Sequence, residues 1–300
     1  MLTPLELDSL YRKGVNISQL LRAEKNFQNN TSEMIEVSYD LQSGSYTAGV
    51  ENKENAKINR NYTKGVVDAI LQLCKPESIL EAGVGEATTL SDVAANIGTD
   101  VHSFGFDLSW SRVAYAKRYL EKNNVSNVTL CTGDMFNIPF ANNSIDVVYT
   151  SHSIEPNGGH EESLLKELFR VSKKFLVLLE PAYELSSEVV RQRMDSHGYC
   201  KNLKGIAESL GYDVINHNLF SAQTTTTNPT AITVIRKESI IDTIINPFVC
   251  PKFKTPLEEI DGMLFSPEAM MVYPIVNGIP CLKIENGILA SKYKEVFENM

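Results

Sequence analysis

The sequence predicts an α/β protein built on a doubly wound, mostly parallel sheet, with a helical and loop segment before it and a small β-rich segment after it. Three observations lead to this prediction. Apolar runs alternate with amphipathic stretches in the middle of the chain, which is the pattern of strand-helix-strand units. A glycine turn follows the first apolar run, and an acid stands at the end of each of the first three. After residue 240, turn dipeptides separate short apolar runs.

The first predicted strand leads into the turn Glu81-Ala82-Gly83-Val84-Gly85. Gly83 and Gly85 permit a sharp strand-to-helix turn and let a ligand approach the backbone. The dinucleotide pattern would need a third glycine where Thr88 stands, and the Glu81 carboxylate would repel a pyrophosphate. A dinucleotide is therefore disfavoured as the ligand.

The acids at the strand ends favour a cationic nucleoside. S-adenosylmethionine carries no phosphate, and carboxylates can bind its sulfonium, ammonium, ribose hydroxyls and adenine amino group. Ligands of doubly wound sheets lie across the carboxyl ends of the strands. Glu81 would face the amino-acid end, and Asp107, about 20 residues beyond the glycine turn, would hold the ribose. Asp134 and Met135 would take the adenine.

These motifs, together with Ile138-Pro139-Phe140, resemble class I S-adenosylmethionine-dependent methyltransferases over roughly residues 60–237. The resemblance implies that the glycine loop contacts the methionine part, the second acid holds the ribose and the third lies near the adenine. The cofactor-binding residues expected are Glu81, Ala82, Gly83, Gly85, Asp107, Leu108, Asp134, Met135 and Ser151. The alternative is that the three acids only cap the helices that follow them.

The remaining pattern completes a Rossmann-like sheet of seven strands, of which the last two match the antiparallel closing hairpin of that family. The predicted strands are the run beginning at Ile79, Val101–Asp107, Val128–Asp134, Ile145–Thr150, Lys174–Leu179, Asp213–Phe220 and Ala231–Ile235. The predicted helices are Thr88–Ile97, Ser111–Asn123 and Glu161–Ser172.

Composition excludes several classes of protein. A chain of 300 residues with 43% hydrophobic content can bury a large core. A formal charge of -9, without a basic cluster interleaved with aromatics, disfavours nucleic acid as a partner. No basic lead, apolar signal core or run of about 18 apolar residues is present, so we expect no membrane contact and a cytoplasmic location. The five scattered cysteines are expected to stay reduced.

Three domains are expected, with boundaries at residues 1–64, 65–238 and 239–300. The first is helical and then passes through Ser38–Thr47, a predicted loop dense in hydroxyl and amide groups. A loop before a catalytic core can act as a lid. Its residues Tyr39, Asp40, Gln42 and Tyr46 could then bind a hydroxylated substrate. The alternative is a surface loop whose tyrosines pack on the core.

The third segment resembles the small zinc-ribbon-like family of methyltransferase-activating proteins. The resemblance lies in Cys250-Pro251-Lys252-Phe253, Asp261–Ser266 and Tyr273–Leu282. Metal-binding members use two Cys-x-x-Cys pairs, of which only Cys250 remains, because the other places hold Phe253, Ser266 and Ala269. With no histidine in this segment, we expect no zinc. Packing on the catalytic domain, or formation of a homodimer, would stabilise this activator or assembly module; the alternative is an unrelated β-hairpin tail.

Methyl transfer to a hydroxyl requires positioning and a base that removes the proton. Beyond the fourth strand stand His152, Glu155 and His160. The Asn-Pro-Pro-Tyr motif of enzymes that methylate amino nitrogens and bases is absent. We therefore expect O-methylation of a small-molecule or glycan hydroxyl, with His152 or His160 as base and Glu155 orienting an imidazole or binding the hydroxyl. The alternative for each histidine is a structural hydrogen bond.

Other functions stay open at this point. Both histidines, with Glu155 and Glu180, could hold a divalent cation that activates a diol, although no metal is our expectation. The acceptor atom could be nitrogen or carbon of another metabolite or of a protein. The chain could also be a cofactor-binding partner protein without catalysis.

Overall fold

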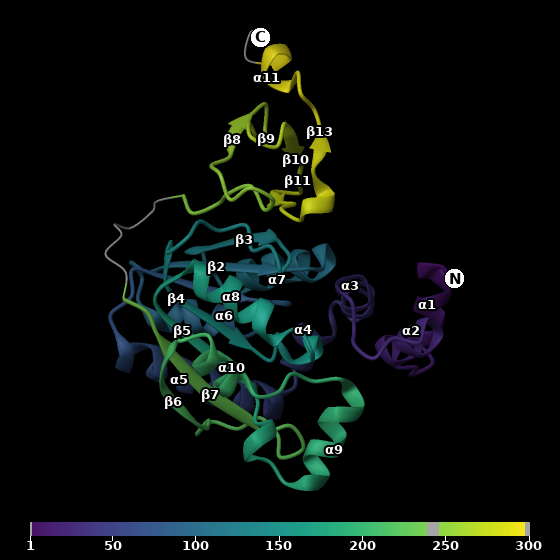
Figure 1. Cartoon of the computed structure of the whole chain (residues 1–300), viewed down its shortest axis with the longest axis vertical. Coiled ribbons are helices and arrows are strands. Elements are labelled where there is room, and N and C mark those ends of the chain that lie inside the picture. The colour runs from purple at the N-terminus through teal and green to yellow at the C-terminus, as the bar shows by residue number, and fades with distance from the viewer. Residues whose placement is uncertain (1, 239–245, 298–300) are drawn as a thin grey trace.

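The computed structural model describes residues 2–238 and 246–297. Its centre is a seven-stranded sheet of order β3-β2-β1-β4-β5-β7-β6, in which only β7 runs antiparallel to its neighbours (Figure 1). The predicted fold class is confirmed. The strands are β1 (Ser78–Ala82), β2 (His102–Asp107), β3 (Val128–Thr132), β4 (Ile145–Ser151), β5 (Ser172–Pro181), β6 (Asp213–Leu219) and β7 (Thr230–Arg236).

Helices cover both faces of this sheet because its strands are apolar on both sides. Adjacent residues of β1 show the alternation: Ile79 belongs to one buried cluster and Leu80 to the other. On the Ile79 side lie α5 (Lys53–Leu73), α6 (Leu90–Ile97) and α7 (Trp110–Lys122). On the Leu80 side lie α8 (Glu161–Val171) and α10 (Leu203–Ser209). The chain also forms α9 (Glu188–His197) and the short 3-10 helices η1 (Glu155–Asn157) and η2 (Tyr183–Leu185).

The amino-terminal segment is more helical than predicted. It contains α1 (Pro4–Tyr11), α2 (Ile17–Lys25), α3 (Ser32–Leu41) and α4 (Ser45–Gly49). The predicted loop Ser38–Thr47 is therefore wrong, since only residues 42–44 separate two helices. The cause is tertiary: Met34 and Ile35 bury one face of α3, and a distant carboxylate binds the first amides of α4, as described below.

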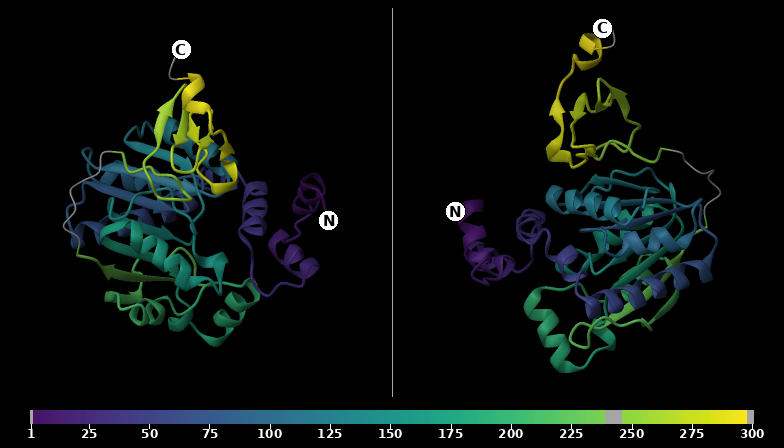
Figure 2. Two further views of the ribbon diagram at one scale, coloured as in Figure 1. Left: turned by 45° about the horizontal axis from the view of Figure 1, so that its top comes forward. Right: turned by 180° about the vertical axis from the view of Figure 1, so that it is seen from behind.

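The predicted boundary near residue 64 falls inside α5. This helix runs for 21 residues and buries Tyr62, Val66 and Ile70 against the sheet. The helix α5 therefore packs on the sheet as part of the central domain and is not a linker before it. The helices α1 and α2 stand to one side of the sheet domain, with α3 between them and the sheet (Figures 1 and 2).

The carboxy-terminal unit is β-rich, as predicted. A sheet of order β13-β10-β9-β8 and a β11-β12 hairpin make up most of it. The predicted boundary at residues 238 and 239 adjoins residues 239–245, which lie outside the described residues. The elements are β8 (Glu258–Ile260), β9 (Met263–Ser266), β10 (Met271–Tyr273), β11 (Ile275–Val276), β12 (Ile279–Pro280), η3 (Ile284–Asn286), β13 (Ile288–Leu289) and α11 (Tyr293–Phe297).

The carboxy-terminal unit packs on the open edge of the large sheet, above β3 (Figure 2). The Leu282 amide donates to the Thr132 carbonyl of β3 at 3.1 Å. The Phe248 and Phe140 rings meet edge-on, with centroids 5.1 Å apart. An uncovered edge strand offers its amides to other chains, and this packing covers the carboxyl end of β3.

Buried thiol, thioether and hydroxyl groups contact one another at the places that the predicted zinc-ribbon resemblance would give to metal ligands. The buried Cys250 Sγ lies 3.7 Å from the Tyr273 hydroxyl, which in turn lies 4.0 Å from the Met271 sulfur. Ser266 is buried and accepts a hydrogen bond from the Ala269 amide at 3.2 Å. All five cysteines of the chain are free thiols.

Candidate active site

A cleft opens at the carboxyl ends of the central strands and encloses about 990 Å³ of empty space, part of it open to solvent. The lid segment, defined here as α3, α4 and the turn between them, forms one wall of the cleft. The predicted residues that line it are Glu81, Gly83, Gly85, Asp107, Leu108, Asp134, Met135, Ser151, His152 and Glu155. Ala82 and His160 do not line it, although both belong to the described residues.

The glycine turn is shaped by close contact with the loop after β4. Gly83 has a φ of 75°, and a Cβ atom on it would lie 2.4 Å from the Ser153 Cβ. Only glycine fits there. The Ser153 hydroxyl donates to the Ala82 carbonyl at 2.6 Å, which fixes the β4 loop against the turn. Ala82 therefore contributes through its backbone.

Glu81 is buried at the floor of the cleft and accepts a hydrogen bond from the Tyr149 hydroxyl at 2.7 Å. Burial raises the pKa of Glu81 to about 8; the Tyr149 hydrogen bond opposes the rise, and the charge of Asp107 adds to it. Glu81 thus binds a proton near neutral pH when no cation is near. A cationic ligand would favour the charged carboxylate and release that proton.

Asp107 joins the second strand to the glycine turn. Its Oδ2 accepts from the Gly85 amide at 2.9 Å, and its Oδ1 accepts from the Ser109 amide at 3.0 Å. A carboxylate has about four lone-pair sites. Each oxygen of Asp107 therefore keeps an acceptor position for a ligand hydroxyl.

Asp134 and Met135 build a polar and apolar corner at the end of β3. The Phe136 amide donates to Asp134 Oδ1 at 2.9 Å, which leaves Oδ2 for another donor. Burial raises the pKa of Asp134, against the lowering effect of that amide. The Met135 methyl lies against Gly83, within 3.3 Å of the place a Cβ would take. An amino-bearing aromatic ring fits such a corner.

Glu86 anchors the lid segment to the glycine turn, and the sequence analysis missed it. Its side chain is fully buried and accepts from the amides of Gly44, Tyr46 and Thr47 at 2.9, 3.3 and 2.7 Å and from the Thr47 hydroxyl at 2.8 Å. A carboxylate at the first amides of a helix also complements its dipole. The acid directly after Gly85 was the only local signal.

Arg112 on α7 completes this anchor. Its guanidinium lies 3.9 Å from the Glu86 carboxylate and packs over the rings of Tyr46 and Tyr39, at 4.4 and 5.1 Å from their centroids. Asp40 adds a further link, because it accepts from the Ser109 hydroxyl at 2.6 Å. Three of the four predicted lid residues therefore act in holding the lid segment to the cleft.

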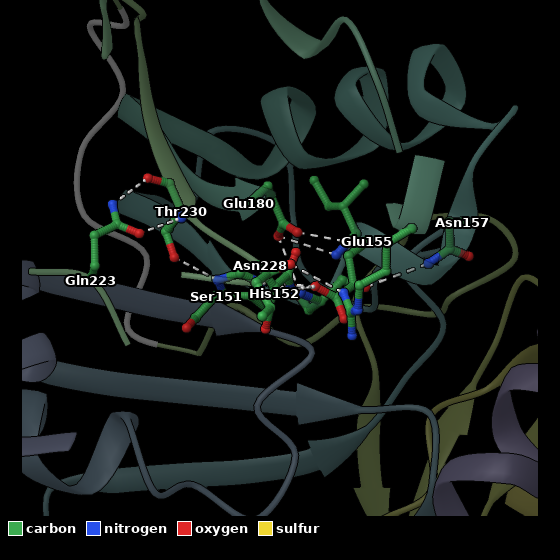
Figure 3. A network of polar contacts seen from close by, with 12 residues as sticks. Ser151, His152, Glu155, Asn157, Glu180, Gln223, Asn228 and Thr230 are labelled. Carbon is green, nitrogen blue, oxygen red and sulfur yellow. Dashed lines mark hydrogen bonds and ion pairs between the residues drawn. The ribbon is translucent and has the colours of Figure 1, made fainter. Parts of the chain in front are cut away.

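A polar network surrounds His152 in the loop after β4 (Figure 3). Its Nδ1 lies 2.8 Å from Glu155 Oε2, and its Nε2 lies 2.7 Å from the Thr230 hydroxyl. Asn228 donates to the same Glu155 oxygen at 3.1 Å. Both ring nitrogens of His152 are thus occupied. Burial lowers the pKa of His152, but the hydrogen bond and charge of Glu155, with the charge of Glu180, outweigh it and raise the pKa above its ordinary value.

Glu180 holds the β4 loop in place. Its carboxylate accepts from the backbone amides of Ser153, Ile154 and Glu155, each at 3.1 Å (Figure 3). Burial raises the pKa of Glu180 to about 7, while the charge of His152 lowers it. No group of three or more His, Cys, Asp or Glu side chains in residues 2–238 and 246–297 is placed to hold a metal. The divalent-cation alternative has no support in this part of the chain.

Ser151 and His160 stand at the two ends of the loop between β4 and α8. His160 precedes α8, and its ring meets that of Phe136 edge-on, with centroids 5.6 Å apart. It reaches the cleft only through Phe136, which lines it. The Ser151 hydroxyl lies 2.8 Å from the Tyr62 hydroxyl, so α5 supports the end of β4.

A sheet of this order, with a glycine turn after its first strand and acids after the next two, defines the class I methyltransferase fold. The chain matches the family described as "Methyltransferase domain" over residues 74–230, just over half of its length, and it belongs to that family.

Solved structures agree with this fold. Magnesium protoporphyrin IX methyltransferase from Synechocystis PCC 6803 with bound S-adenosylhomocysteine has a TM-score of 0.54 and 13% identity, over 69% of this chain and 100% of that chain. The structure of the same enzyme with bound S-adenosylmethionine has a TM-score of 0.52 and 13% identity, over 69% of this chain and 97% of that chain. A methyltransferase from Aquifex aeolicus has a TM-score of 0.45 and 18% identity, over 56% of this chain and 87% of that chain.

The protein is a methyltransferase, as predicted, and the cofactor predicted for it is S-adenosylmethionine. The residues of the cleft fit this molecule. Three carboxylates with acceptor capacity, Glu81, Asp107 and Asp134, lie beside an apolar wall that includes Met135. The space over Gly83 would be closed by any side chain there. In the described residues, none of the helices is long and apolar enough to cross a membrane.

Proposed function

We propose that the protein is an O-methyltransferase that acts on a small-molecule or glycan hydroxyl. The observation that carries this proposal is the His152–Glu155 pair at the cleft, which a hydroxyl acceptor needs and a strong nucleophile would not. In the proposal the cofactor-binding residues are Glu81, Ala82, Gly83, Gly85, Asp107, Leu108, Asp134, Met135 and Ser151.

When bound, S-adenosylmethionine supplies a methyl group on a sulfonium sulfur, whose transfer to a hydroxyl oxygen leaves the thioether and one proton to be removed. Glu155 is the member of the pair placed to meet the hydroxyl, because His152 Nε2 faces Thr230. The hydroxyl donates to Glu155, and its proton passes through that carboxyl group to Nδ1 of a neutral His152, whose Nε2–H donates to Thr230. The imidazolium so formed then stabilises the Glu155 carboxylate. His160 has no assigned role, since it does not line the cleft.

The carboxy-terminal unit is proposed to be a built-in assembly module that supports the adenine side of the cleft. The Val249 amide donates to the Pro139 carbonyl at 3.0 Å, in the loop that follows Asp134. Lys283 pairs with Glu36 of α3, a residue that lines the cleft. The unit therefore contacts both the loop below the predicted adenine site and the lid segment above it.

The experiment that tests the function is a screen of hydroxylated small molecules with methyl-labelled donor and full-length protein. We expect a methyl ether product and a large loss of turnover with His152→Ala. His217→Ala is a matched control, because His217 also hydrogen-bonds a threonine of β7, at 2.9 Å from Thr233, but does not line the cleft. Methyl transfer only to nitrogen or carbon would contradict the proposal, as would donor binding without turnover on any acceptor.

A further inference from the structure

A second cavity adjoins the cleft and encloses about 960 Å³ of empty space, part of it open to solvent. It is bounded by α1 and α2, by the lid segment and by the chain after α9. Four residues line both cavities: Tyr39, Tyr46, Glu155 and Pro156. Glu155 therefore stands at the boundary between them, where a molecule in the second cavity can reach it.

We propose that this second cavity is the methyl-acceptor site and that it takes a small hydroxylated molecule bearing one carboxylate. The inference rests on the proposed O-methyltransferase function, because it names the class of substrate that meets Glu155.

Arg22 on α2 supplies the charge that favours an acid. Its Nη2 donates to the Ser196 carbonyl at 3.2 Å, whereas its buried Nε has no hydrogen-bond partner. Arg22 pairs with no carboxylate within residues 2–238 and 246–297. Gly198 leaves room for the guanidinium, since a Cβ there would lie 2.6 Å from Nη1. A partly buried guanidinium that lines a cavity and has no carboxylate partner is a binding group for a carboxylate.

Unused acceptors in the same cavity suit hydroxyl groups. Asn30 is 3% exposed, and its Nδ2 donates to the Pro156 carbonyl at 2.7 Å while its buried Oδ1 has no partner. His197 Nδ1 lies 2.9 Å from the Arg193 carbonyl, which can only accept. A hydrogen therefore resides on Nδ1, and Nε2 is the ring nitrogen left to meet a ligand hydroxyl.

The charge balance favours one negative charge on the ligand. Among the described residues that line the cavity, Arg22 is the only lysine or arginine and Glu155 the only acid. Glu155 stands at the boundary with the cleft and already contacts His152 and Asn228, at 2.8 and 3.1 Å, whereas Arg22 meets no carboxylate in the described residues. One guanidinium matches a carboxylate better than a phosphate ester, which carries about 1.5 to 2 charges at neutral pH. The net charge of -9 repels acids elsewhere on the protein, so the attraction is local.

The test measures binding of matched pairs to the full-length protein loaded with S-adenosylhomocysteine. Hexuronic acids and hydroxybenzoic acids are each compared with their primary amides, which keep the hydroxyls and lose the charge. We expect at least one acid to bind about tenfold or more tightly than its amide, the effect of one charge-assisted hydrogen bond. Arg22→Gln should remove that preference.

Two further variants keep the test decisive. Gln42→Glu places a carboxylate in the cavity, at a position whose side chain is half-buried. The variant should weaken the binding of the acids and leave the binding of the amides unchanged. Arg191→Gln is the matched control, because Arg191 lies on α9, pairs with Glu188 at 3.0 Å and does not line the cavity. If the Arg22→Gln protein does not bind S-adenosylhomocysteine or does not fold, the Gln42→Glu variant still tests the preference for acids.

The inference is overturned if no acid in the panel binds, if amides bind as tightly as acids, or if a folded Arg22→Gln protein keeps the preference. Failure of the proposed function looks different. In that case the protein does not bind S-adenosylhomocysteine at all, or it transfers methyl groups without using a hydroxyl.

Discussion

The proposed donor side and the proposed acceptor side of the active site are built in different ways. On the donor side, Glu81, Asp107 and Asp134 stand at the ends of three strands, and each is placed by its own strand and the turn that follows. On the acceptor side, Glu155 is held by His152, three residues earlier, and by Asn228, 73 residues later in the chain. The donor side is thus encoded locally, whereas the acceptor side depends on tertiary packing.

This difference has a functional reason. A cofactor that never changes can be bound by a few groups on a rigid sheet edge, whereas the acceptor differs among methyltransferases. Loops and added helices supply that variation without disturbing the sheet. In this protein the added helices α1 to α4 bring Arg22, Asn30 and Tyr39 to the second cavity.

Glu155→Gln should separate the two sides with the largest effect. The amide cannot accept a proton from the acceptor, so turnover should fall about 100-fold or more, within the usual range for losing a general base. The dissociation constant of S-adenosylhomocysteine should stay unchanged, because Glu155 lies on the acceptor side. Steady-state kinetics and calorimetry measure the two quantities. An equal loss of turnover and of S-adenosylhomocysteine affinity would show that Glu155 does not belong to the acceptor side alone.

Asp107→Asn should do the reverse. The variant loses a charged acceptor for the Gly85 and Ser109 amides and for a ligand hydroxyl. We expect the dissociation constant of S-adenosylhomocysteine to rise about 10- to 100-fold, as for loss of one or two charge-assisted hydrogen bonds. Turnover at saturating donor should change less than affinity. Unchanged donor affinity in calorimetry would remove Asp107 from the donor side.

The pH dependence of turnover should report the acceptor side. His152 must be neutral before the pair can take a proton, and its pKa is raised by Glu155 against the effect of burial. Turnover should therefore fall about tenfold for each pH unit below that raised pKa. In Glu155→Gln the residual activity should show its inflection at lower pH. A flat profile in the wild type would exclude the pair as the base.

Glu81→Gln should change stability and donor affinity in opposite directions. The pKa of Glu81 is about 8 in the folded protein against an ordinary 4.5, so the folded state holds an extra proton and loses stability as the pH rises through this window. At pH 9 the variant should be more stable than the wild type and at pH 5 it should not. Its donor affinity should fall at the higher pH. Urea unfolding and calorimetry at both pH values test this.

Lys283→Met should have the smallest effect. Lys283 is buried at the contact with the lid segment, where it pairs with Glu36 and also lies 3.3 Å from Glu285. Removing the ammonium should lower the free energy of unfolding by about 1 kcal/mol and leave turnover nearly unchanged. The control is Lys292→Met, since Lys292 forms an exposed pair with Glu295 at 2.7 Å. This variant should change the free energy of unfolding by less than about 0.5 kcal/mol. A measurable loss of S-adenosylhomocysteine affinity with Lys283→Met would contradict this prediction and would show that Lys283 contributes to donor binding.

Most of the sheet and the donor side could be predicted from the sequence, because alternating apolar runs and turn residues act over short distances. The strand β6, for example, was expected at Asp213–Phe220 and is observed at Asp213–Leu219. The acids Glu81, Asp107 and Asp134 line the cleft, although their individual roles stay predictions.

The helices of the lid segment and the long-range contacts of the acceptor side could not be predicted, since their causes lie far along the chain. The helix α4 has no side-chain cap of its own and takes its anchor from Glu86. Likewise, nothing near His152 in the sequence indicates that Thr230 occupies its second ring nitrogen. Arg22 gave no signal at all, because a single arginine on a polar helix is normally a surface residue.

The pairing of Leu282 with Thr132 has a consequence for synthesis of the chain. The ribosome releases the amino-terminal part first, at about 5 to 20 residues per second. Leu282 lies 150 residues after Thr132, so a nascent chain carries open hydrogen-bonding groups at the end of β3 for many seconds before their partner is made. Crowded polysomes would bring such groups together. A lower level of expression, or a chaperone that binds extended backbone, should therefore raise the yield of correctly assembled enzyme.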